Sequence, residues 1–344
     1  MAPGREGAFR VPPPTVARVS KRDHGGGLDA TVATYGGTRA DWLDLSTGIN
    51  PVPYPVGEIS GDAWTALPDS GAMDRLLAAA RKFWDVPDGA EIVAANGASA
   101  LIAQMPHLGE SFGAVYIPKP TYNEHEAAFA SSGTWSVWDK DSSNAAVFVH
   151  PNNPDGRLWP ASAMGGARDL TIIDESFCDV TPQQSHIALS EDQGILVLKS
   201  FGKFWGLAGL RLGFAIAQPA LLFPRKMYKG QDLAPEASLT DRLGPWAVAG
   251  PALEIGARAL EDLAWADATR ARLAADAARL DELVGWPLVG GTDLFRTYEV
   301  PDAAAMQDKL AQGKVWSRIF PYADNWLRLG LPAPDRWAQL QAAL

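Results

Sequence analysis

Short, continuously apolar runs alternate with segments of helical spacing over the first two thirds of the chain. Six of these runs are candidate strands: 91–94, 114–117, 146–149, 170–173, 195–198 and 212–217. Strands that are apolar on both faces and are separated by helices are typical of a mostly parallel sheet sandwiched by helices. The pattern therefore predicts an α/β domain, in which ligands bind at the carboxyl ends of the strands.

The pattern changes after residue 224. Residues 252–284 are rich in Ala, Leu, Arg and Asp at helical spacing, which predicts one or two long amphipathic helices, and the runs 294–300 and 326–331 predict further strands. We therefore expect an N-terminal arm over residues 1–35, a large domain over 36–224 and a smaller α+β C-terminal domain over 225–344. Three consecutive prolines at 12–14 favour an extended arm.

Composition narrows the class of protein. The net charge of -10 argues against nucleic acid or an anionic membrane as a partner, because both favour basic surfaces. Cys178 is the only cysteine, which excludes an intrachain disulfide and fits a reducing compartment. Residues 1–27 contain no apolar stretch suited to a signal peptide, and no run is long enough to cross a bilayer. We expect a cytoplasmic protein that needs no metal.

The segment after the candidate strand 195–198 contains a lysine in a glycine-rich loop, Lys203. A buried ammonium group is costly unless it has a partner or a task, and burial beside cations lowers the pKa of a lysine, as imine chemistry requires. Ser200 and Arg211 flank it, and a hydroxyl with an arginine fork suits a phosphate dianion. Lys199 is the rival lysine, but it lacks the matching spacing to Arg211.

Other polar residues follow the candidate strands. Asp174 ends one of them and Asn153 lies in an Asn-Pro turn, although a helix cap and an ordinary turn are the simpler interpretations of these two residues alone. Gly97, Ala98 and Ser99 come directly before a helical run over 100–108, where free backbone N–H groups bind phosphate well. Tyr122 follows Pro120-Thr121 and could equally be a half-buried surface residue.

The motif Ser-x-x-Lys followed by Gly-Leu-x-Gly-Leu-Arg-x-Gly, over residues 200–213, resembles the cofactor-lysine signature of the class I/II aminotransferases. These are pyridoxal 5'-phosphate (PLP) enzymes of fold type I. The resemblance implies that Lys203 is the catalytic residue and holds PLP as a Schiff base, and that Asp174, with Glu175 as a weaker alternative, keeps the pyridine nitrogen protonated. The other PLP-binding residues it implies are Gly97, Ala98, Ser99, Tyr122, Asn153, Ser200 and Arg211.

The N-terminal region points to one branch of this family. His24-Gly-Gly-Gly followed by Asp44-Leu-Ser-Thr-Gly-Ile-Asn-Pro resembles the opening of the cobalamin-pathway threonine-phosphate decarboxylases. These enzymes convert L-threonine O-3-phosphate to (R)-1-amino-2-propanol O-2-phosphate, so the implied partner is a phosphorylated amino acid. The resemblance implies that Arg328 binds the substrate carboxylate and that His24 and Arg318 bind its phosphate. It implies Asn50 as a further substrate contact.

Two alternatives remain open. A histidinol-phosphate-type aminotransferase shares the positions of Lys203, Asp174 and Asn153, and a non-catalytic PLP-binding module would keep the lysine without turning over an amine. Two departures from the family also matter. Phe177 replaces a tyrosine that bonds to the phenolic oxygen of PLP, and Leu67 replaces a tyrosine that reaches the neighbouring subunit's phosphate. A homodimer is still expected, because this fold normally closes its active site at a two-fold interface.

Overall fold

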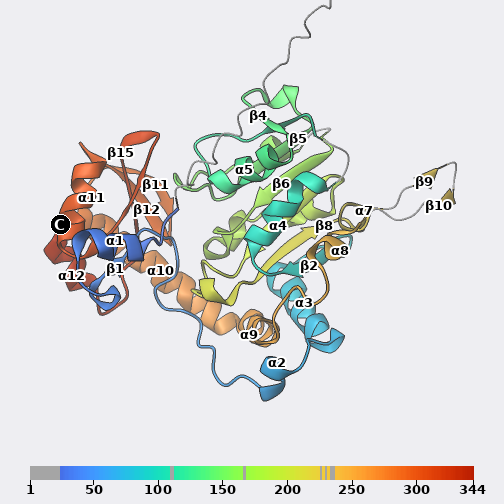
Figure 1. The fold of residues 1–344 in the computed structure, drawn as a ribbon, viewed down its shortest axis with the longest axis horizontal. Coiled ribbons are helices and arrows are strands. Elements are labelled where there is room, and N and C mark those ends of the chain that lie inside the picture. Colours follow the sequence, from blue (N-terminus) through green and yellow to red (C-terminus); the bar gives the residue numbers. More distant parts are fainter. Residues whose placement is uncertain (1–23, 109–111, 166–167, 225–226, 229–230, 233–236) are drawn as a thin grey trace, which may run out of the picture.

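The computed structural model describes residues 24–108, 112–165, 168–224, 227–228, 231–232 and 237–344. Residues 1–23 of the expected N-terminal arm therefore lie outside the described residues. Two bodies are visible in Figure 1, one built around a large sheet and one around a smaller sheet near the C-terminus. The long helix α10 (Leu263–Val284) passes from one body to the other.

The large sheet has seven strands in the order β2-β8-β7-β6-β5-β3-β4. Strand β8 runs antiparallel to both of its neighbours, while the other pairs are parallel. The bounds are β2 (Glu91–Ala95), β3 (Ala114–Tyr116), β4 (Trp135–Val137), β5 (Ala145–Val149), β6 (Leu170–Asp174), β7 (Ile195–Ser200) and β8 (Gly213–Ala217). The predicted α/β fold with a mostly parallel sheet is confirmed. The sequence missed β4, because this short edge strand exposes Trp135 and has no continuous apolar run.

Helices cover both faces of this sheet, and alternate residues of each strand serve the two faces. In β7, Ile195 and Val197 join the core under α3 (Ser70–Trp84) and α9 (Gly250–Glu261), whereas Leu196 and Leu198 join the core under α4 (Ala98–Gln104) and α5 (Asn123–Ser131). Helix α3 begins where the Asp69 carboxylate accepts a hydrogen bond from the Ala72 N–H at 3.1 Å. The carboxyl ends of β5, β6 and β7 are left free for a site.

The smaller sheet is antiparallel, in the order β11-β12-β15-β14. Its elements are β11 (Leu288–Thr292), β12 (Phe295–Glu299), β14 (Arg318–Phe320) and β15 (Ala323–Gly330), with α1 (Leu28–Tyr35), α11 (Ala303–Gln312) and α12 (Trp337–Ala343) around it. The expected division at residues 36 and 225 stays a prediction. Two contacts cross the expected boundaries. Strand β1 (Leu43–Asp44), in the expected large domain, pairs with β13 (Val315–Trp316) of the C-terminal body, and α9, in the expected C-terminal domain, packs on α3 of the large body.

The remaining elements are short. They are α2 (Gly61–Thr65), α6 (Ala161–Met164), α7 (Pro219–Leu222), α8 (Leu239–Leu243), β9 (Met227–Tyr228) and β10 (Gln231–Asp232), together with 3-10 helices at Arg39–Asp41, Met105–His107, Lys140–Ser142, Cys178–Val180, Pro182–Gln184, Ile187–Glu191 and Ala208–Leu210. Across the described ranges, no helix combines the length and the apolar character that a membrane span requires.

Candidate active site

A cavity lies at the carboxyl ends of β5, β6 and β7 and has two lobes. We call the inner one the cofactor lobe; among the residues that line it are Ala98, Ser99, Tyr122, Asn153, Asp174, Phe177, Ser200, Lys203 and Arg211. All the residues expected to bind PLP therefore line this lobe, with the exception of Gly97. Segments separated by more than a hundred residues meet here because the strand ends that carry them are neighbours in the sheet.

Lys203 lies in the turn after β7, with its Nζ 5.2 Å from the centre of the Phe177 ring. Desolvation, assisted by the positive charges of Arg328 and Arg211, lowers the pKa of this amine to about 8, although Asp174 acts in the opposite direction. A larger fraction of Lys203 is therefore uncharged at neutral pH than of an exposed lysine. This is the state in which an amine can act as a nucleophile.

The rival lysine has a different environment. Lys199 is 1% exposed, and its Nζ lies 2.6 Å from Glu175 Oε2 and 3.7 Å from Asp179 Oδ1. Glu175 also accepts hydrogen bonds from Ser185 Oγ and from the His186 N–H. Lys199 and Glu175 thus form a buried ion pair in the core, and neither residue lines the cofactor lobe.

Asp174 is 2% exposed, and its Oδ2 lies 2.8 Å from His125 Nε2. Its Oδ1 accepts hydrogen bonds from the N–H of Ser176 at 3.0 Å and from its hydroxyl at 2.5 Å. Burial raises the pKa of this carboxyl, but the His125 and Ser176 hydrogen bonds outweigh it and lower the pKa overall. An ionised Asp174 requires the hydrogen of His125 to be on Nε2. The sequence analysis missed His125, although its position three residues after Tyr122 places both at the start of α5.

Two glycines allow close packing at the end of the lobe that contains Arg211. Gly97, with φ at +84°, lies so near Arg211 that a Cβ there would be 2.6 Å from Arg211 Nη2. A Cβ on Gly213 would lie 2.3 Å from the Ala98 nitrogen. Gly97 therefore serves by leaving room for Arg211 rather than by lining the lobe. Arg211 itself has a left-handed backbone, with φ at +53°, before β8 begins.

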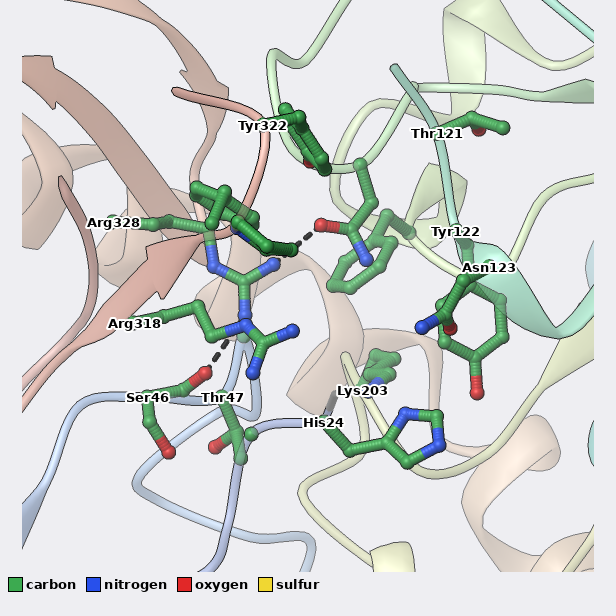
Figure 2. A pocket seen from close by; sticks show the side chains of 16 residues that line it. His24, Ser46, Thr47, Thr121, Tyr122, Asn123, Lys203, Arg318, Tyr322 and Arg328 are labelled. Atoms are coloured by element: carbon green, nitrogen blue, oxygen red, sulfur yellow. Dashed lines mark hydrogen bonds between the residues drawn. The ribbon is translucent and has the colours of Figure 1, made fainter. Parts of the chain in front are cut away.

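The outer or substrate lobe has a volume of about 320 Å³. It shares Tyr122, Asn153, Phe177 and Lys203 with the cofactor lobe, and its further lining includes His24, Gly25, Ser46, Thr47, Arg318, Tyr322 and Arg328. Figure 2 shows Arg318 and Arg328 side by side on one wall, with Lys203 and His24 across from them. The two arginines are neighbours because Arg318 in β14 is paired in register with Arg328 in β15.

Arg328 is 5% exposed. It donates one hydrogen bond to Asn153 Oδ1 and another to the Ser46 carbonyl at 2.7 Å, while its Nε is buried without a partner. Burial and the neighbouring Arg318 lower its pKa to about 9, so it remains protonated at neutral pH. Among the residues described, no carboxylate lies within ion-pair distance of Arg328. A buried cation in this state favours an anionic ligand.

His24 lies at the edge of the substrate lobe, and its Nε2 is 2.9 Å from Glu124 Oε1. The Arg318 guanidinium lies 5.5 Å from the centre of the Phe320 ring. Both residues expected to contact a substrate phosphate therefore reach the same lobe as Arg328.

Asn50 is placed differently from the expectation of a substrate contact. It is 2% exposed and lines neither lobe. Its side chain instead donates to the Phe204 carbonyl at 2.8 Å and accepts from Arg272 Nη2 at 2.7 Å. Asn50 therefore lies beneath the loop that carries Lys203, which we call the lysine loop. This loop covers the Asn50-Pro51 turn of the sequence motif.

The two residues that depart from the family pattern also have clear positions. Phe177 is 3% exposed, and its ring packs edge-on against Phe295 at 5.0 Å between centres. It thus supplies an apolar wall between the lobes. Leu67 is 67% exposed and lines neither lobe of the cavity; it lies at the surface before α3.

Comparisons with known proteins agree with this geometry. The family model for aminotransferase class I and II matches residues 57–343. A threonine-phosphate decarboxylase from Pseudomonas aeruginosa is 39% identical over 342 residues, covering 94% of this chain and 97% of the relative. A histidinol-phosphate aminotransferase from Burkholderia lata is 29% identical, covering 88% of this chain and 90% of the relative.

Among solved structures, the histidinol-phosphate aminotransferase from Sinorhizobium meliloti, determined in complex with pyridoxal-5'-phosphate, superimposes with a TM-score of 0.74. The match covers 93% of each chain at 16% sequence identity, a level that supports a common fold. The sequence match and the shared fold, together with a lysine, an aspartate and an arginine in one lobe, show that the chain belongs to the class I and II aminotransferase family of PLP enzymes.

Proposed function

We propose that this enzyme decarboxylates L-threonine O-3-phosphate to (R)-1-amino-2-propanol O-2-phosphate, a step of cobalamin biosynthesis. The observation that carries the proposal is the substrate lobe, where the buried Arg328 and the adjacent Arg318 face Lys203. A substrate with a carboxylate and a phosphate needs two cationic groups in addition to those that hold the cofactor. The 39% identical relative with the same activity in its name supports this choice.

The cofactor lobe fits PLP in three respects. Arg211, Ser200 and the start of α4 gather donors for a phosphate, and Gly97 leaves the room that Arg211 occupies. Asp174 is a buried carboxylate whose pKa is lowered, as a partner for a protonated ring nitrogen must be. Tyr122 and Asn153 lie between the two lobes, where the ring and its phenolic oxygen would be held. Bound PLP supplies an electron sink for the bond that breaks at the substrate's α-carbon.

The chain's own residues orient the substrate and move the proton. Arg328 offers its guanidinium to the substrate carboxylate, while Arg318 and His24 offer positive charge to the phosphate. Holding both anions selects which bond at the α-carbon lies in position to break, which is a matter of orientation rather than of new catalytic groups. Lys203, with a pKa of about 8, can hold a proton and deliver it to the α-carbon after CO2 has left.

The first test is to incubate the purified, PLP-loaded protein with L-threonine O-3-phosphate in the absence of any 2-oxo acid. We expect CO2 in stoichiometric amounts with aminopropanol phosphate, and no product from the variant Lys203→Ala. Amino transfer that appears only after 2-oxoglutarate is added would establish the histidinol-phosphate-type aminotransferase instead. If neither product forms while the cofactor absorbance is intact, the chain is a PLP-binding module.

We also propose that the enzyme is a cytoplasmic homodimer. Trp64, Leu67 and Trp246 are 67%, 67% and 58% exposed, and two adjoining grooves that share Pro68 and Asp69 lie beside them. Apolar side chains grouped in this way favour a protein interface. The single cysteine, Cys178, is buried and free, which fits a reducing compartment.

A further inference from the structure

Residues 50–54 run along the loop that carries Lys203. The Asn50 N–H donates to the Lys203 carbonyl at 3.0 Å, and the Tyr54 N–H donates to the Trp205 carbonyl at 2.9 Å. The two segments touch so closely that a Cβ on Gly206, whose φ is +69°, would lie 2.6 Å from Pro53 Cα. The backbone position of Lys203 is therefore set by residues 50–54 as well as by β7.

The Asn50 side chain ties this contact to helix α10. Its amide donates to the Phe204 carbonyl at 2.8 Å, and its Oδ1 accepts from Arg272 Nη2 at 2.7 Å and from the Val52 N–H at 3.0 Å. Arg272 also reaches Asp276 Oδ2 at 3.1 Å, one turn further along the same helix. A side chain with this many partners in a buried position has one orientation.

The same helix is bonded at its other end to the strands that present Arg328. Asp281 accepts from the Tyr298 hydroxyl at 2.7 Å and from Arg296 Nε at 3.0 Å. These two residues are in β12, where the intervening Thr297 is paired in register with Arg328 of β15. Helix α10 thus connects Lys203, through Arg272 and Asn50, with the sheet that carries Arg328.

We infer that Asn50 and Arg272 are positioning residues that fix the Lys203 loop to helix α10 and thereby hold the lysine in place relative to Arg328. These two groups must act on one small substrate, and displacements of about 1 Å in such a pair reduce rates by about a hundredfold. The inference rests on the proposed function only in taking Lys203 as the cofactor lysine. It gives Asn50 and Arg272 a role without contact to cofactor or substrate.

The test measures capture of PLP by the cofactor-free protein as a function of pH, followed by visible absorbance, in Asn50→Ala and Arg272→Ala. Capture needs the uncharged amine, and desolvation with Arg328 and Arg211 keeps the Lys203 pKa low against Asp174. A loosened loop exposes the amine to more water, so its pKa rises and the profile moves to higher pH. We expect a rise of about one pH unit, which makes capture about tenfold slower at neutral pH.

Matched variants separate this role from a general loss of stability. Arg279→Ala removes the same charge from the same helix, where Arg279 lies 4.1 Å from the Trp337 ring and away from the lysine loop, and should keep the wild-type profile. Asn50→Asp keeps the acceptor for Arg272 but cannot donate to the Phe204 carbonyl, so it should shift the profile as well. The double variant Asn50→Ala/Arg272→Ala should capture PLP no more slowly than the slower single variant, because both substitutions break the same connection.

Wild-type profiles in both single alanine variants would overturn the inference, and so would an equal shift in Arg279→Ala. If Asn50→Ala does not fold, Arg272→Ala decides by the same comparison with Arg279→Ala. The readout needs no substrate, so a wild-type protein that releases no CO2 would end the proposed function while leaving this measurement able to support or overturn the positioning role.

Discussion

Two lysines only four residues apart have opposite chemistry because their surroundings differ. Desolvation, together with the charges of Arg328 and Arg211, lowers the pKa of Lys203 to about 8, and the Asp174 carboxylate offsets this only in part. Lys199 is more deeply buried than Lys203, but the carboxylates of Glu175 and Asp179 outweigh desolvation and raise its pKa. Charge environment at the scale of single residues therefore decides which lysine can react.

Arg328 should be sensitive even to a conservative change. Lysine in its place keeps the charge but loses the fork that can hold a carboxylate with two hydrogen bonds, so we expect Arg328→Lys to lower kcat/KM for the phosphorylated substrate by about tenfold to a hundredfold. Steady-state decarboxylation kinetics measure this. Arg157→Lys, at an exposed arginine outside the cavity lining, is the control. An Arg328→Lys enzyme as efficient as the wild type would contradict the role in carboxylate binding.

At the scale of elements, neighbouring residues at the ends of β6 and β7 line either the cavity or the core. Asp174 at the end of β6 faces the cofactor lobe, whereas the next residue, Glu175, turns into the core and meets Lys199 of β7. The indole N–H groups of Trp84 and Trp205 both donate to the nearby Asp179 carboxylate. A buried network of charges and hydrogen bonds thus stabilises the ends of β6 and β7 on the side of the core.

Breaking this network from one side should be costly. Lys199→Met leaves the Glu175 carboxylate buried without its cation, and we expect it to lower the free energy of unfolding by about 3–5 kcal/mol. The double variant Lys199→Met/Glu175→Gln should lose less, because only the Asp179 carboxylate, which keeps its hydrogen bonds from Trp84 and Trp205, then lacks the cation. Urea unfolding followed by tryptophan fluorescence gives these values.

The control for this prediction is Lys119→Met, which breaks the exposed pair between Lys119 and Glu126. It should cost less than about 1 kcal/mol, because surface ion pairs contribute little. Equal losses in Lys199→Met and Lys119→Met would show that burial of the Lys199–Glu175 pair has no energetic weight.

At the scale of the whole molecule, the cavity is lined by residues from both bodies, so the relative placement of the bodies matters to function. His24 and Ser46 come from the N-terminal segment, Lys203 from the large sheet, and Arg318 and Arg328 from the small one. The exposed apolar residues Trp64, Leu67 and Trp246 line neither lobe, and Leu67 and Trp246 lie in the two grooves that share Pro68 and Asp69. That surface is where we place the proposed two-fold contact.

Light scattering coupled to size exclusion should give twice the mass of one chain for the wild type. The variant Trp64→Glu/Leu67→Glu should shift it toward one chain, because two charges would have to be desolvated in the interface. Trp138→Glu changes a residue that is 83% exposed beside the opposite sheet edge at β4, and it should leave the mass unchanged. A wild type that elutes as a single chain at micromolar concentration would refute the dimer.

The sequence by itself determined the fold class and predicted most of the polar residues that line the cofactor lobe. Buried parallel strands need continuous apolar runs, and the proposed cofactor lysine lies with its proposed phosphate-binding neighbours within one local motif, so both leave a pattern along the chain. Ser200, Lys203 and Arg211 are such a local set, Asp174 ends a recognisable strand, and Asn153 lies in the turn that follows another.

Only the tertiary structure decided the partners that come from distant segments. The hydrogen bond of His125 to Asp174, the pairing of Lys199 with Glu175 and the contact of Asn50 with Arg272 join residues 24 to 222 positions apart. No periodicity along the chain encodes such contacts, because they depend on which strand ends and helices the folded core brings together. For the same reason Asn50, with a motif that suggested a substrate contact, lies beneath the lysine loop instead.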